Sequence, residues 1–285
     1  MGELRAPGLR ANWLNAWLAA LGVTVLIDGA RLRWSDDGVP VAVLEVPSAD
    51  DVATAVAEAL PRSDQLDALA IARPRLERRV TPDRYRAAAA IARRSQSDFS
   101  LAASLTDLAP PEDSGVLRHG PFDPAVPRGE TLWDRLRRCR ETLEGAGRVE
   151  DLVRRSLEGN GIRFGINGLG FDVTRISDTD AAAKYVDPVI EYLAFWGLAF
   201  FPVRGDGKRL RTRGWGTTPS VLVWPVWRPP LDRWAIDALL GLAFGTRQVK
   251  RWRELGLGIH RAYESVRYQA SGDDRTTGFA SRSVL

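Results

Sequence analysis

Residues 187–244 contain a series of local signals whose order restricts the fold more than any other feature of the chain. Asp187 is suited to cap a helix, Pro188 to occupy its first turn, and Gly197 to end it. After this helix we predict a strand over 198–203, a basic hairpin over 204–213, a strand over 220–227, and a helix capped by Asp232 that reaches Phe244.

The same order of signals occurs near the start of the chain. Asn12 is the expected cap of an apolar helix that Gly22 ends, and Ser48 is the expected cap of a helix to Leu60. Between them the pattern predicts strands over 23–27, 31–34 and 41–46. We interpret the two segments as an internal duplication that should superpose as helix, three-stranded antiparallel sheet and helix. The alternative is that units of this kind are simply common.

The predicted fold class is therefore α+β, with two related lobes, each helix–antiparallel strands–helix, and a helical segment between them. Prolines and glycines concentrated in 107–130 cannot support a long helix or strand. The predicted organisation is an N-terminal α+β lobe with a helical extension (1–106), a Pro/Gly-rich connector (107–130), a C-terminal α+β lobe with the basic hairpin (131–268) and a polar tail (269–285).

Composition narrows the class of protein. With 285 residues, 45% of them hydrophobic, the chain can bury a full core. It has no apolar run of the length that a membrane helix needs, and its first residues lack a signal-peptide layout, so we expect a cytoplasmic protein without membrane contact. Cys139 is the single cysteine, which excludes an internal disulfide.

Residues suited to catalysis are scarce. The sequence has 2 histidines and no phosphate-binding Gly-Lys-Ser/Thr motif. The glycine-rich segment 159–170 follows a helix and precedes extended sequence, the reverse of a dinucleotide-binding loop, so a glycine-punctuated strand or hairpin is favoured. We expect no catalytic residues, no metal site and no cofactor.

Basic residues concentrate toward the C-terminus, where 185–285 holds 15 Lys/Arg against 9 Asp/Glu. Cations beside an aromatic ring suit RNA or single-stranded DNA, because the cations meet phosphates and the ring stacks on a base. The predicted nucleic-acid-binding residues form one cluster in the hairpin and one after the last helix: Arg204, Lys208, Arg209, Arg211, Arg213 and Trp215, then Arg247, Lys250, Arg251 and Arg253. An ordinary solvated surface is the alternative for both. The other tryptophans that we assign are expected in the core: Trp13, Trp17, Trp196, Trp224, Trp227 and Trp234.

Several segments resemble a family of CRISPR-associated proteins from type I-G (formerly I-U) loci. They are 7–22 (Pro-Gly-Leu-Arg-Ala-Asn-Trp-Leu-Asn-Ala-Trp-Leu-Ala-Ala-Leu-Gly), 98–104, 159–161, 167–172, 187–189 and 193–198. The small helicase-nuclease extension family of those loci is the most similar. Its pattern of a helix, a glycine and a strand is shared with the larger type I-G effector subunits. These segments consist of packing and turn residues and carry no catalytic signature.

The resemblance implies a non-catalytic subunit or accessory protein of an antiviral, crRNA-guided DNA surveillance complex. In such complexes base pairing reads the sequence while protein subunits hold the nucleic-acid backbones. The implied partners are other effector subunits, the helicase-nuclease, and crRNA or DNA. A protein-interaction adaptor that never touches nucleic acid is the alternative, and an enzyme of unrecognised type is a third hypothesis.

Overall fold

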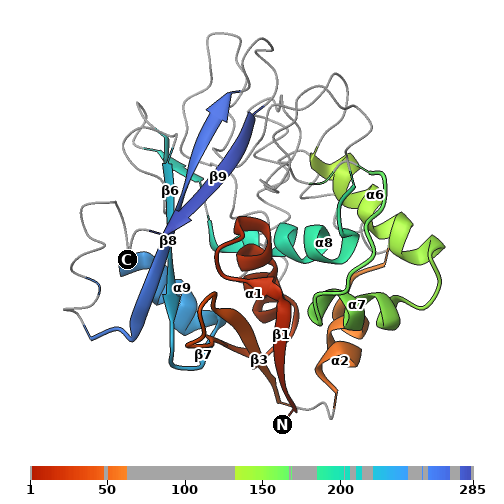
Figure 1. Ribbon diagram of the computed structural model, residues 1–285, viewed down its shortest axis with the longest axis horizontal. Coiled ribbons are helices and arrows are strands. Elements are labelled where there is room, and N and C mark those ends of the chain that lie inside the picture. The colour runs from red at the N-terminus through yellow and green to blue at the C-terminus, as the bar shows by residue number, and fades with distance from the viewer. Residues whose placement is uncertain are drawn as a thin grey trace.

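The structure of the chain is a computed structural model, shown in Figure 1. It describes residues 2–47, 51–62, 132–166, 168, 185–201, 203–205, 210–213, 221–242, 252, 256–269 and 277–283.

The described residues form helices and three antiparallel sheets. The helices are α1 (Leu14–Leu26), α2 (Val52–Ala59), α6 (Leu132–Gly145), α7 (Val149–Leu157), α8 (Pro188–Gly197) and α9 (Arg233–Leu242). The first sheet has the strand order β1 (Gly2–Arg10), β3 (Val41–Val46), β2 (Arg31–Trp34), β7 (Leu231–Asp232). The second sheet pairs β4 (Val203–Gly205) with β5 (Leu210–Thr212). The third sheet has the strand order β6 (Val221–Trp227), β8 (Ile259–Gln269), β9 (Thr277–Ser283). The predicted α+β class is confirmed.

Helices α1 and α8 cross at the centre of the molecule (Figure 1). Both are buried on almost every side, as their continuous apolar sequences require. At the crossing each helix places a glycine against the other's backbone: a Cβ on Gly22 would overlap the carbonyl of Leu193, and one on Gly197 would overlap the carbonyl of Leu18. The two backbones therefore approach more closely than any residue with a side chain would allow.

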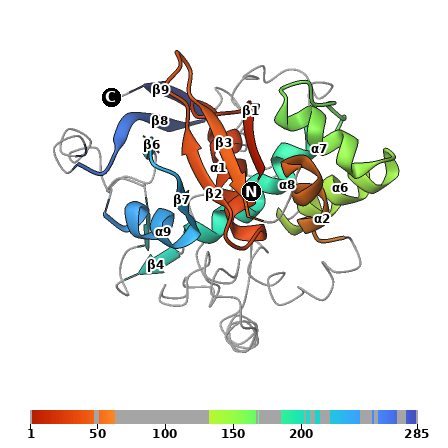
Figure 2. The ribbon, with the colours of Figure 1, turned by 90° about the horizontal axis from the view of Figure 1, so that it is seen from below.

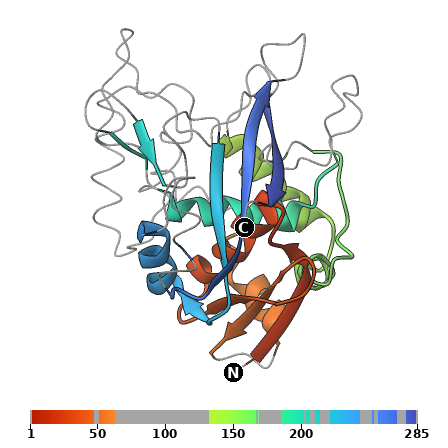
Figure 3. The same ribbon diagram turned by 60° about the vertical axis from the view of Figure 1, so that its left-hand side comes forward.

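Layers of other elements cover this helix pair. The sheet β6–β8–β9 lies on one side of it, and α2, α6 and α7 lie on the other (Figures 1 and 3). Two tryptophans join the sheet to α1, because Trp17 Nε1 donates to the carbonyl of Pro225 at 3.2 Å and Trp224 Nε1 donates to the carbonyl of Ala11 at 2.8 Å. Pro225 is tolerated within β6 because β6 is an edge strand. The sheet β1–β3–β2 covers α1 from below (Figure 2).

The predicted duplication is wrong, because the two segments do not share a unit of helix, three-stranded antiparallel sheet and helix. The first segment has the order α1–β2–β3–α2, and the second has the order α8–β4–β5–β6–β7–α9. The predicted strand over 23–27 is wrong, since α1 continues through Gly22 to Leu26. The strand predicted over 198–203 begins only at Val203, after a 3-10 turn over Leu198–Phe200. The strands of the second half do not form one three-stranded sheet either, because β6 pairs with β8.

Two of the four predicted helix caps are confirmed. Asp187 caps α8, and Asp232 accepts a hydrogen bond from the backbone N–H of Ala235 in α9. The cap of α2 is Asp51 rather than Ser48, and the residue before α1 is Trp13, whose side chain makes no capping bond, rather than Asn12.

The described parts of the two halves share one core. Strand β7 belongs to the second half but pairs with β2 of the first, and one hydrophobic cluster contains residues of both. The connector predicted over 107–130 lies outside the described residues. Within the predicted polar tail, Thr277–Ser283 forms β9, which pairs along β8. No helix in the described part of the chain is both long enough and apolar enough to cross a membrane.

Candidate functional site

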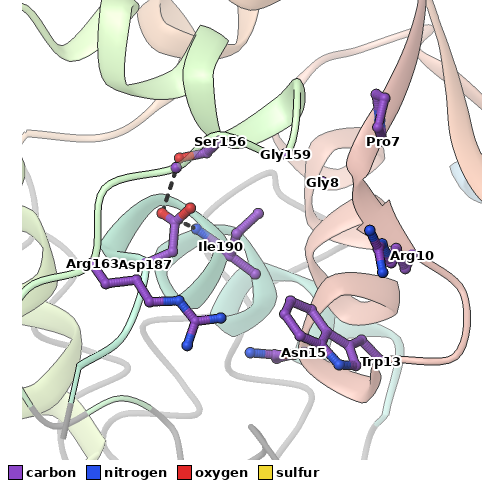
Figure 4. Close-up of a pocket in the computed structure, with 11 residues that line it drawn as sticks. Pro7, Gly8, Arg10, Trp13, Asn15, Ser156, Gly159, Arg163, Asp187 and Ile190 are labelled. Atoms are coloured by element: carbon purple, nitrogen blue, oxygen red, sulfur yellow. Dashed lines mark hydrogen bonds between the residues drawn. The ribbon is translucent and has the colours of Figure 1, made fainter. Parts of the chain in front are cut away.

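A pocket of about 180 Å³ opens where three distant segments of the chain meet (Figure 4). The segments are the end of β1 with the start of α1, the turn after α7, and the start of α8. The lining residues are Pro7, Gly8, Arg10, Trp13, Asn15, Ser156, Gly159, Gly161, Arg163, Asp187 and Ile190.

An irregularity in β1 shapes one wall of this pocket. The pairing of β1 with β3 jumps from Ala6↔Ala42 to Arg10↔Val41, so residues 7–9 have no counterpart on β3. Extra residues of this kind bend a strand and redirect its side chains. Here the bend brings Gly8 against the end of α7, where a Cβ would overlap the carbonyl of Ser156. Glycine is therefore required at position 8 by packing.

A second pair of glycines forms the facing wall. Gly159 has a φ of +87°, a conformation that residues with a Cβ rarely adopt, and it turns the chain out of α7. Gly161 lies so close to the carboxylate of Asp187 that a Cβ would overlap Oδ2. The glycines that the sequence assigned to a strand or hairpin are thus the residues that let the carboxylate reach the pocket.

The two carboxylate oxygens of Asp187 differ in their hydrogen bonds. Oδ1 accepts hydrogen bonds from Ser156 Oγ at 3.0 Å, from the backbone N–H of Val189 at 2.9 Å and from that of Ile190 at 3.4 Å. Among the described residues no donor reaches Oδ2. Burial raises the pKa of the Asp187 carboxyl above its usual value, against the lowering effect of these hydrogen bonds and of Arg163.

Arginines flank an aromatic ring at the mouth of the pocket. Trp13 is partly buried, and the guanidinium carbon of Arg163 lies 5.9 Å from its ring centroid. Arg10 and Arg163 are both exposed, and Figure 4 shows them on either side of Trp13. Trp13 was expected in the core, so its place at the pocket differs from the prediction; Trp17, Trp196, Trp224 and Trp227 are core residues as predicted.

A buried polar contact fixes the start of α1 beside the pocket. Asn15 Nδ2 donates to Glu191 Oε1 at 3.0 Å, and both residues are buried. The Glu191 carboxylate lies against Gly168, whose carbonyl accepts a hydrogen bond from the buried Arg135 at 2.6 Å. Because buried polar groups are costly unless paired, this contact holds α1, α8 and α6 in one arrangement.

The structure describes only some residues of the predicted hairpin cluster. Strands β4 and β5 form the predicted hairpin, with Arg204 opposite Arg211. The side chain of Arg213 is 19% exposed, forms an ion pair with Asp237 of α9, and donates to the carbonyl of Phe200 at 3.4 Å. Arg213 thus has an intramolecular partner. Lys208, Arg209 and Trp215 lie outside the described residues, as do Arg247, Lys250, Arg251 and Arg253 of the second cluster.

The pocket residues were not identified from the sequence. Trp13 belonged to an apolar helical pattern that Arg10 precedes, Arg163 stood among glycines, and Asp187 was interpreted as a helix cap. The lining comes from segments that are far apart in the sequence, and no local pattern connects them.

Metal-ligating clusters of three or more His, Cys, Asp or Glu side chains do not occur in the described part of the chain. The groups that line the pocket include two guanidinium groups, of Arg10 and Arg163, the ring of Trp13, and the Asp187 carboxylate, whose Oδ2 receives no donor from the described residues. Comparison with protein-family models, with curated proteins and with solved structures finds no match to this chain.

Proposed function

We propose that this chain binds single-stranded nucleic acid without catalysing a reaction, as a cytoplasmic subunit or accessory protein of a type I-G CRISPR surveillance complex. The observation that carries the proposal is the convergence of Arg10, Arg163 and Trp13 at the mouth of one pocket. Proteins that bind single strands combine cations that follow the backbone with aromatic rings on which bases stack.

The family resemblance supports the same function from an independent direction. Residues 7–22, 159–161 and 187–189 are far apart in the chain, and the fold brings them together around the pocket (Figure 4). Segments that carry the resemblance therefore meet at the place where cations and an aromatic ring lie side by side.

The position of the hairpin is consistent with one extended nucleic-acid strand that contacts both the hairpin and the pocket. Asp187 precedes α8 and β4 begins soon after α8 ends, so pocket and hairpin lie toward opposite ends of this helix. A helix of 10 residues is about 15 Å long. A single strand of a few nucleotides is long enough to contact both.

Binding to fluorescent single-stranded RNA and DNA, measured by anisotropy over a range of salt concentrations, tests the proposal. Replacing both Arg10 and Arg163 with alanine should reduce the log–log salt slope by about 1.4, at about 0.7 per phosphate contact of a single strand. Trp13→Ala should weaken binding by about 1–3 kcal/mol and leave that slope nearly unchanged.

Matched controls separate the site from general effects of charge and aromatic content. Arg148 has a side chain that is 74% exposed and lies at the other end of α7, so Arg148→Ala removes a charge away from the pocket. Trp234→Ala removes an exposed tryptophan of α9. The proposal fails if the controls weaken binding as much as the pocket variants do, or if the protein binds neither RNA nor DNA.

One observation favours the adaptor as a second candidate function. Trp234, expected in the core, is 51% exposed, and Leu242 on the same helix is 63% exposed. Contiguous exposed apolar patches are typical of protein-interaction sites, and two such side chains on one helix could form part of one. If α9 meets a protein subunit, Trp234→Ala should abolish capture of that subunit in a pull-down from nuclease-treated lysate while strand binding stays intact.

A further inference from the structure

We propose that the pocket holds one unstacked nucleobase that carries an amino group, with Trp13 as its aromatic wall and Asp187 Oδ2 as the acceptor for the amino hydrogen. This inference rests on the proposed function and adds to it a preference for cytosine, adenine or guanine over uracil or thymine.

The size of the pocket indicates a fragment of a larger ligand. At about 180 Å³ it is smaller than the roughly 300–1,000 Å³ pockets that enclose drug-sized molecules. A whole dinucleotide cofactor does not fit such a space. A single base does, provided that its sugar and phosphate stay outside.

The charges are arranged in a way that separates base from phosphate. Arg10 and Arg163 are exposed, so they meet a backbone that passes over the mouth. The carboxylate of Asp187 lies at the start of α8, next to Arg163 (Figure 4). A phosphate placed there would be repelled by the carboxylate, whereas an N–H donor would be attracted to it.

The geometry of Asp187 assigns the acceptor to one atom. Oδ1 already accepts hydrogen bonds from Ser156 Oγ and from two backbone N–H groups of α8. Oδ2 receives no donor from the described residues and packs against Gly161, which has no side chain to displace it. A carboxylate oxygen is an acceptor, so it can take a hydrogen bond from a ligand donor.

Bases differ in whether they can supply that donor. Cytosine, adenine and guanine carry an exocyclic amino group, whereas uracil and thymine present carbonyl oxygens on either side of a single N–H. Those oxygens face a carboxylate unfavourably. A hydrogen bond to a charged group contributes about 1.5–3 kcal/mol net, so the preference should be on the order of tenfold or more.

The test compares a fluorescent oligouridine with the same strand carrying one central cytidine, and the corresponding deoxyuridine and deoxycytidine strands. The two pyrimidines have the same ring size and differ in the amino and carbonyl groups of the base edge. We expect the strand with cytidine to bind on the order of tenfold more tightly. Trp13→Ala should weaken binding of both strands.

Asp187→Asn is the decisive variant. Asparagine caps a helix about as well as aspartate, so α8 should remain folded, which a thermal melt checks. The three donors around Oδ1 require an oxygen at that position, and the amide NH₂ must therefore replace Oδ2. A donor then stands where the acceptor was, and the preference for cytidine should disappear or reverse toward uridine. Asp232→Asn serves as the control, because it makes the same substitution at a helix cap outside the pocket.

Each outcome bears on a separate claim. Equal binding of the two strands, with the effect of Trp13→Ala retained, overturns the base preference and leaves the proposed function standing. An unchanged preference for cytidine in Asp187→Asn overturns the role of Asp187. Absence of binding to every strand overturns the proposed function and this inference together.

Discussion

Single glycines decide how closely the elements of this protein approach. Gly22 and Gly197 lie within or at the end of helices, where glycine costs about 1 kcal/mol relative to alanine. Both were interpreted as helix ends, which is correct for Gly197 and wrong for Gly22. The reason lies in the tertiary structure, because Gly22 is needed for contact with α8 and does not end α1.

Replacing either glycine with alanine should destabilise the protein. The new Cβ meets a backbone carbonyl, which cannot rotate away, and overpacking of this kind typically costs about 1–3 kcal/mol. That cost exceeds the gain in helix propensity. We expect Gly22→Ala and Gly197→Ala each to lower the free energy of unfolding, measured by urea denaturation.

Gly241 in α9 provides the matched control. Among the described residues, a Cβ there meets only a guanidinium nitrogen of Arg213, at 4.0 Å. Gly241→Ala should therefore raise the free energy of unfolding, by about 0.4–1 kcal/mol. Equal effects at the three positions would contradict the close crossing of α1 and α8.

At the scale of elements, sequence signals predicted correctly those features that depend on neighbouring residues alone. The caps at Asp187 and Asp232, the proline in the first turn of α8 and the hairpin β4–β5 follow from short-range chemistry and are confirmed. The run over 23–27 is apolar, and periodicity alone cannot separate a buried strand from a buried helix. Packing of α1 against α8 determines that it is helical.

The basic hairpin remains a predicted contact for single-stranded RNA or DNA. If each cation meets a phosphate, replacing Lys208, Arg209 and Arg211 with alanine should reduce the log–log salt slope by roughly 2. Trp215→Ala should weaken binding by about 1–3 kcal/mol if the ring stacks on a base. Titrations of labelled strands over a range of salt concentrations measure both effects.

Arg213 supplies the contrast for this experiment. Its guanidinium is held by Asp237 and by the carbonyl of Phe200, so Arg213→Ala should change the salt slope less than the other hairpin arginines do. A triple variant at 208, 209 and 211 with the wild-type slope would show that the hairpin does not carry the contact.

At the scale of the molecule, the candidate site lies at a junction that no local pattern reveals. Arg10, Ser156 and Asp187 come from three separate segments, and each is locally explained by a strand, a helix or a cap. Their proximity depends on the bulge in β1 and on the glycines that let backbones touch. Predicting it from the sequence would require knowing the packing of α1, α7 and α8 beforehand.

The shared core also predicts how the protein unfolds. Since β7 completes the sheet of the first half and α1 packs on α8, neither half buries its apolar surface alone. We expect urea unfolding followed by tryptophan fluorescence and by far-UV circular dichroism to give coincident single transitions. Two separate transitions would instead show that the halves are independent lobes.

The pairing of α1 with α8 has a consequence for the growing chain on the ribosome. Helix α1 ends at Leu26 and its partner begins at Pro188. At about 5–20 residues per second, roughly 10–30 s pass before α8 has been synthesised. During that interval the apolar faces of α1 lack their main cover, and β2 lacks the strand that protects its edge. We therefore expect the nascent chain to expose this apolar surface until α8 and β7 have been synthesised.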